Sequence, residues 1–129
     1  MTPPLFPQTS PFGLVPQDPA PPLATVRGAS GAVYQFQIHP IGTEYLPRSG
    51  VYIFVKIGAN GQWDPIYIGE TSSFQRRLYN DLRLHHQWPG IVAHRASHIL
   101  TLHVPGVLAL RENIETDIRQ ITTTPCNEQ

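Results

Sequence analysis

Two short apolar stretches decide the fold: Gly50-Val51-Tyr52 opens the first, and Tyr67-Ile68-Gly69 closes the second. The first stretch continues through Ile57 and is rich in β-branched and aromatic residues, which are typical of β-strands. Asn60-Gly61 between them supplies turn residues, so the second stretch predicts the returning strand of a β-hairpin. In such a hairpin Tyr52 and Tyr67 lie on adjacent strands, where their side chains can contact each other.

A helix is predicted directly after the hairpin. Ser72-Ser73-Phe74-Gln75 has the form of a capping box, which places the start of the helix at Ser72. Phe74, Leu78 and Leu82 recur every four residues and form one apolar stripe toward the sheet. Trp88-Pro89-Gly90 is expected to end this helix.

The remaining elements are read from hydrophobic periodicity. Val33–His39 alternates apolar and polar residues as a half-buried strand does, and His98–Val104 reads as another strand. A second helix is predicted over Val107–Ile121 with a buried stripe. The members of that stripe are Leu110, Ile114, Ile118 and Ile121. The order predicts an α+β fold with one small mixed β-sheet flanked by helices.

The N-terminal segment differs in composition. Eight of the 14 prolines lie in the first 22 residues, so residues 1–27 are predicted to be a disordered, proline-rich arm and residues 28–129 the folded domain. The arm could recruit a protein partner through a groove that reads polyproline helices. The chain shows no secretory pattern and no apolar run of about 20 residues, and its lone Cys126 excludes an internal disulfide. A cytoplasmic protein without membrane association is expected.

The net charge is zero, yet basic residues gather between Thr71 and Arg95. This segment holds three histidines, one acid (Asp81) and four arginines, which are Arg76, Arg77, Arg83 and Arg95. Arginine suits bidentate phosphate contacts, so the segment indicates a polyanionic partner such as nucleic acid. A solvated helix face is the alternative reading.

These residue types fit the hydrolysis of a phosphodiester bond. The reaction needs a base for the attacking water and stabilisation of added negative charge. Tyr52 or Tyr67 could take the proton, with its pKa lowered by Arg77 and a divalent cation, or could hydrogen-bond to a metal-activated water. Glu115 is the strongest candidate for a metal-ligating carboxylate. A single carboxylate suits one Mg²⁺, which keeps several of its waters.

The joint order of these residues resembles the GIY-YIG nuclease domain, found in an excinuclease subunit, in homing endonucleases and in a small stand-alone bacterial branch. The two signatures are Gly50-Val51-Tyr52 and Tyr67-Ile68-Gly69, and the resemblance covers roughly residues 48–129. It implies a metal-dependent endonuclease acting on DNA, with one Mg²⁺ or Mn²⁺ on Glu115. It implies Tyr52 as the likelier base, Arg77 on the phosphate, and Asn127 holding the glutamate or the substrate.

The chain departs from the family one helical turn after Arg77. The family usually has a histidine or tyrosine there, whereas this chain has Asp81. His85 and His86 follow one turn later, so we expect a four-residue insertion with His85 in the histidine's role, neutralising the phosphate. Further substrate contacts are assigned to Arg76, Arg83 and His86, and the choice of catalytic arginine among Arg76, Arg77 and Arg83 stays open.

Two alternatives compete with the nuclease. Asp81 and the zero net charge favour a nucleic-acid-binding module of the same fold that cuts slowly or not at all. A non-nucleolytic domain, in which both tyrosines are core residues, is the other.

Overall fold

The computed structural model describes residues 20–127 and is built on one five-stranded sheet in the order β1-β2-β5-β3-β4. The strands are β1 (Leu23–Arg27), β2 (Val33–Pro40), β3 (Gly50–Ile57), β4 (Trp63–Thr71) and β5 (His98–His103). The predicted α+β class is confirmed, but the predicted mixed sheet is wrong, because all neighbouring strands are antiparallel. The long connection after β4 places β5 on the far side of β3. β5 therefore runs in the direction of β4 without pairing with it.

The sheet begins earlier than the sequence predicted. Strand β1 pairs with β2 from Leu23 opposite Gln37 to Arg27 opposite Val33, and Ala24 and Val26 are buried. The expected start of the fold at residue 28 is therefore too late. The prolines just before β1 obscured an alternation only five residues long. Residues 1–19 of the expected arm, and residues 128–129, lie outside the described residues.

The central hairpin follows the prediction. Gly61 has φ +80° in the turn, where glycine meets no steric penalty, and the Asn60 side chain accepts a hydrogen bond from Gln62 N at 3.1 Å. Strand β3 is buried on both faces, with Tyr52 and Phe54 on one face and Val51, Ile53 and Val55 on the other. The hairpin therefore carries its tyrosines on one defined face of the sheet.

The segment after β4 is not the single helix that was predicted. It forms a wide π-helical turn η1 (Arg76–Asn80), a 3₁₀ turn η2 (Leu82–Leu84) and a separate helix α1 (Trp88–Ala93). The amide of Asp81 donates to Arg76 O at 2.8 Å, five residues back, which widens the turn. The cap is Ser73 rather than Ser72, since Ser73 Oγ accepts from Arg76 N at 3.2 Å.

Two other predictions for this segment had different outcomes. Phe74, Leu78 and Leu82 are buried as expected, because their stripe covers the tyrosine-bearing face. Trp88-Pro89-Gly90 does not end a helix but begins α1. Proline is tolerated there because the first turn of a helix has no acceptor for its amide.

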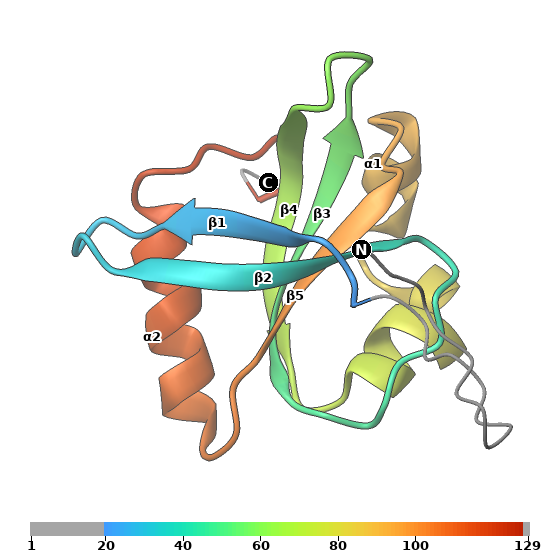
Figure 1. The fold of residues 1–129 in the computed structure, drawn as a ribbon. Coiled ribbons are helices and arrows are strands. Elements are labelled where there is room, and N and C mark those ends of the chain that lie inside the picture. The colour runs from blue at the N-terminus through green and yellow to red at the C-terminus, as the bar shows by residue number, and fades with distance from the viewer. Residues whose placement is uncertain (1–19, 128–129) are drawn as a thin grey trace, which may run out of the picture.

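Helix α2 (Leu108–Arg119) confirms the second predicted helix but rotates its buried face. Ile118 is buried and Ile114 half-buried, whereas Leu110 and Ile121 are exposed and Arg111 is buried. Figure 1 shows α2 on one side of the curled sheet, and α1 with the turns before it on the other side. The sheet thus has one core under α2 and a second core under the segment that follows β4.

Candidate functional site

Tyr52 and Tyr67 lie side by side on the same face of the sheet. Tyr52 pairs with Gly69, and Tyr67 pairs with Phe54, so the two tyrosines are diagonal neighbours with ring centroids 6.1 Å apart. A Cβ atom on Gly69 would lie 2.6 Å from Tyr52 Oη and 2.8 Å from Tyr67 Cε2. The glycine of the second signature therefore leaves room for the tyrosine of the first.

Gly69→Ala is accordingly expected to displace the Tyr52 ring and destabilise the fold by about 1–3 kcal/mol, the usual cost of overpacking. Urea denaturation measures the loss. Gly58→Ala at the base of the hairpin turn is the control, since the nearest neighbour of its added Cβ would be the side chain of the exposed Asn60, at 3.1 Å, which can shift to relieve the contact. Equal stability of Gly69→Ala and wild type would contradict this packing account.

His85 holds the hydroxyl of Tyr52. Its Nε2 lies 2.7 Å from Tyr52 Oη, and its Nδ1 accepts a hydrogen bond from Gln87 N at 3.0 Å. A neutral imidazole has one donor and one acceptor nitrogen, so the proton is on Nε2 and is donated to Tyr52. A donor in this position favours the ionised form of the tyrosine.

Burial is the largest cause of the pKa shifts of Tyr52, Tyr67 and His85. It raises the pKa of Tyr52; the neighbouring Tyr67 raises this pKa further, whereas Arg77 lowers it. Burial also raises the pKa of Tyr67, which Arg77 and the hydroxyl of Tyr52 lower. For His85, burial, with His86 and Arg77, lowers the pKa to about 4. His85 is therefore neutral at pH 7. It is also only 4% exposed, so its expected role in neutralising the charge of a phosphate does not fit its environment.

This shift predicts an acid-sensitive fold. The pKa of His85 is about 4 in the folded protein and 6.5 ordinarily, so the unfolded chain binds the extra proton between these values. The stability from the neutral imidazole is complete above pH 6.5. It is lost as the pH falls toward 4, by on the order of 2 kcal/mol.

Denaturation of wild type and His85→Gln at pH 4 to 8 measures this effect. The wild type should lose stability more steeply below pH 6.5 than the variant does, because the variant lacks the titrating ring. Parallel pH profiles for the two proteins would rule out a buried, neutral His85.

A hollow of about 280 Å³ lies beside the tyrosine pair and gathers most of the predicted basic residues. It is lined by Arg76, Arg77, Asp81, Leu84, His85 and His86. The exposed ring of His86 stacks on His85 at a centroid distance of 4.8 Å, and its Nε2 lies 3.5 Å from Tyr67 Oη. Arg83 is exposed and does not line the hollow. Asp81, as the sequence suggested, brings a carboxylate among the arginines.

Glu115 joins the site from the other side, on α2. Its side chain is 18% exposed and forms an ion pair with Arg119 at 3.6 Å. Burial raises the pKa of Glu115, which Arg119 lowers and Glu70 raises. Its charge also raises the pKa of both tyrosines, so it lies within electrostatic reach of them. Arg119 was not predicted from the sequence, although its i,i+4 spacing from Glu115 is the signal of a helical ion pair.

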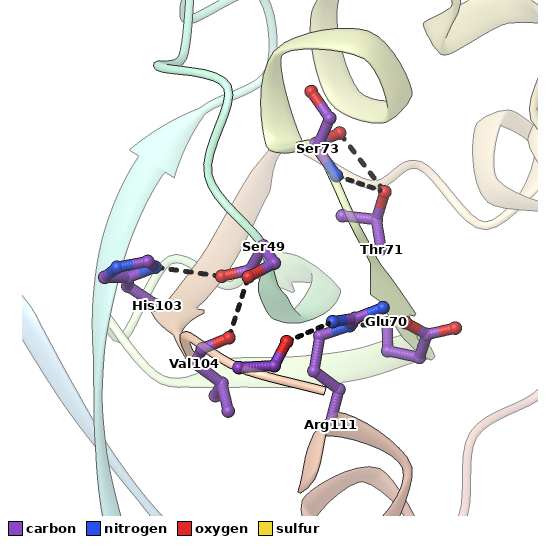
Figure 2. Close-up of polar contacts among 8 residues, drawn as sticks. Ser49, Glu70, Thr71, Ser73, His103, Val104 and Arg111 are labelled. Carbon is purple, nitrogen blue, oxygen red and sulfur yellow. Dashed lines mark hydrogen bonds and ion pairs between the residues drawn. The ribbon is translucent and has the colours of Figure 1, made fainter. Parts of the chain in front are cut away.

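A second ion pair fixes α2 against the hairpin. Arg111 Nε donates to Glu70 Oε1 at 2.8 Å, and Arg111 Nη1 donates to Gly106 O at 3.3 Å (Figure 2). Arg111 is 7% exposed, and Glu70 directly follows the signature glycine Gly69. Arg111 precedes Glu115 by one helical turn, so this contact sets where Glu115 lies relative to β4. No sequence signal identified the pair, because its members are 41 residues apart.

Asn127 lies at the edge of the site rather than inside it. Its Oδ1 accepts from Ile68 N at 2.7 Å, and its Nδ2 donates to Ile68 O at 2.9 Å. Its amide thus acts as a partner for the edge strand β4, between Tyr67 and Gly69. The expected contact with Glu115 is indirect: Arg119, which pairs with Glu115, lies 3.5 Å from Asn127 O.

The described residues therefore bring Arg77, His85 and His86 to the tyrosine pair, with Arg76 at the rim of the hollow and Glu115 within electrostatic reach from α2. They contain no group of three or more His, Cys, Asp or Glu side chains arranged to hold a metal ion.

No helix in the part of the chain that the structure describes is long and apolar enough to cross a membrane. Comparisons with protein-family models, curated proteins and solved structures find no match for this chain.

Proposed function

We propose that this protein is a cytoplasmic, metal-dependent endonuclease that hydrolyses phosphodiester bonds in DNA. The observation that carries the proposal is the convergence of two tyrosines, a basic hollow and one carboxylate from three separate parts of the chain. Arg77 and Glu115 both perturb the pKa of Tyr52, although 38 residues separate them in the sequence (115 − 77 = 38). The resemblance to the GIY-YIG domain assigns the same residues.

The donor set is compatible with one hydrated Mg²⁺ or Mn²⁺. Mg²⁺ in phosphoryl-transfer sites is held by one or two carboxylates together with substrate oxygens and waters. Glu115 is the residue that would hold it, since its carboxylate is half-buried and near both tyrosines. Such a cation, when bound, would supply positive charge to the phosphate and increase the acidity of a water.

The chain's own residues would bind the substrate and move the proton. Arg76 and Arg77, which line the hollow, would bind the phosphate there, with the exposed imidazole of His86 beside them. The proton of the attacking water would pass to Tyr52, the proposed base of the tyrosine pair, which must first ionise against the burial that raises its pKa. As the water oxygen bonds to phosphorus, the P–O bond to the leaving group breaks. His85 donates from Nε2 to Tyr52 and, with Arg77, stabilises the phenolate. The leaving oxygen takes its proton from solvent.

One observation favours the second candidate function, a nucleic-acid-binding module that cuts slowly or not at all. Asp81 lines the same hollow as Arg76 and Arg77, so it competes with a phosphate for their positive charge. In such a module the arginines would retain affinity for a polyanion without productive alignment.

A nicking time course on supercoiled plasmid separates the two functions. The nuclease is expected to relax the plasmid with Mg²⁺ or Mn²⁺ and to stop when EDTA is added. A binding module would instead give salt-sensitive gel shifts with no product on plasmid, single-stranded or branched DNA, and that result would overturn the proposed activity.

A further inference from the structure

A second hollow, of about 200 Å³, lies on the same face of the sheet as the two tyrosines. It lies between the loop that joins β2 to β3 and the strands β2 and β5. Its floor is Gln37 and His39 from β2 with Thr101 and His103 from β5, and Tyr45 and Phe74 form its walls. Thr101 pairs with Gln37 on one side and with Tyr52 on the other, so only β5 separates the two sites.

The floor offers several hydrogen-bonding side chains. His103 Nδ1 lies 2.9 Å from Ser49 O, a carbonyl that can only accept, so Nδ1 carries the proton (Figure 2). In the neutral ring Nε2 is then an acceptor. Burial lowers the pKa of His39, which favours the neutral form of that ring. The side-chain amide of Gln37 adds a donor and an acceptor side by side.

The wall contains a polar group without a partner. Tyr45 is 8% exposed, and its hydroxyl is buried with no hydrogen-bond partner among the described residues. Its ring packs edge-on against His39 at 5.4 Å and is tilted against Phe74 at 6.2 Å. A buried hydroxyl without a partner is costly, and a bound polar group would supply one.

We propose that this hollow binds one nucleobase of the nucleic-acid strand, taken out of its stack. This inference rests on the proposed function for the identity of the strand. Aromatic walls and neutral donors and acceptors are the means by which proteins hold an unstacked base. Glu44 and Arg48 both line this hollow, and the negative charge of the first offsets the positive charge of the second. The hollow therefore attracts a phosphate less than the basic hollow does. Gln37 makes adenine the first base to test, because an amide pairs with adenine through two hydrogen bonds.

The two hollows suit successive parts of one strand. Phe74 lines the second hollow, and Arg76 and Arg77, in the turn that follows, line the first. A strand whose phosphate is bound by the arginines would have a base within reach of the neutral hollow. Bases that fit this hollow poorly would then be cut more slowly, which gives the enzyme a local sequence preference.

Titration with adenosine, followed by ¹H–¹⁵N NMR on the full chain without metal, tests the proposal. Adenosine is expected to cause saturable shifts at Gln37, Thr101 and His103, whereas ribose alone causes none. Gln37→Leu and Tyr45→Phe should each weaken binding roughly threefold to tenfold, the size of one hydrogen bond. Gln35→Leu, on the same face of β2 but outside the hollow, is the matched control.

Tyr45→Phe gives a second readout. The free variant should be at least as stable as wild type, because it loses a buried hydroxyl without a partner, although it binds adenosine more weakly. Equal shifts with ribose, absent saturation, or unchanged affinity in Gln37→Leu would overturn the inference. Adenosine carries no phosphate, so DNA cleavage without adenosine binding would refute this site alone. Adenosine binding without cleavage would refute only the nuclease.

Discussion

Glu115→Gln is expected to weaken Mn²⁺ binding and to slow plasmid nicking by roughly a hundredfold to a thousandfold, the effect of removing one essential electrostatic group from an active site. The amide keeps the shape of the side chain but removes the negative charge that would attract a cation. Titration of Mn²⁺ by electron paramagnetic resonance measures binding independently of activity.

Glu112→Gln is the matched control for this variant. Glu112 lies on the same helix but is exposed, so its replacement should leave nicking and Mn²⁺ affinity within about twofold of wild type. The fold should survive in Glu115→Gln, because among residues 20–127 the carboxylate forms an ion pair with the exposed Arg119 alone. Full activity in Glu115→Gln would remove Glu115 from the metal site.

Tyr52→Phe and Tyr67→Phe are each expected to lower the nicking rate by roughly a hundredfold to ten-thousandfold, the range for loss of a general acid–base group. The two variants should differ in stability. Tyr52→Phe leaves the Nε2–H of the buried His85 without an acceptor and should cost about 1–3 kcal/mol. Tyr67→Phe loses the long 3.5 Å contact with His86 and the polar neighbour of the Tyr52 hydroxyl, and should cost less than Tyr52→Phe because the Tyr67 hydroxyl holds no buried imidazole.

Tyr79→Phe serves as the control, since Tyr79 is 42% exposed and does not line the basic hollow. Its rate and stability are expected to match wild type. If both signature variants cleave as fast as Tyr79→Phe, the tyrosines are core residues rather than catalytic groups. In that case the two tyrosines would be explained by their packing alone, and the proposed proton transfer would have no base.

The sequence predicted those parts of the fold that depend on local pattern. The β3–β4 hairpin, the strands β2 and β5 and the helix α2 all follow from residue alternation and turn residues within a few positions of each other. The sequence did not predict the break after Asn80, because the wide turn at Arg76–Asn80 depends on packing that buries Phe74, Leu78 and Leu82 together against the sheet. It also did not predict that Arg111 belongs to the buried face of α2, because its partner Glu70 lies on strand β4, far away in the sequence.

The site shows the same division. The family resemblance led us to expect His85 at the tyrosine site, and its Nε2 does lie 2.7 Å from Tyr52 Oη. Its charge state was not readable from the sequence, since burial and the neighbouring His86 and Arg77 lower its pKa to about 4. Asn127 was likewise expected from the resemblance, whose spacing between glutamate and asparagine it matches. Its observed contact is with the backbone of β4, which no spacing rule reveals.

The most direct test of the account is a side-by-side nicking assay of wild type, Glu115→Gln and Glu112→Gln with Mg²⁺ or Mn²⁺, and of wild type with EDTA. The account predicts metal-dependent nicking by wild type and Glu112→Gln, and near-complete loss in Glu115→Gln and in EDTA. Nicking that persists in Glu115→Gln at the wild-type rate would contradict it. So would a wild-type protein that binds DNA in a salt-sensitive manner yet cuts no plasmid, single-stranded or branched substrate.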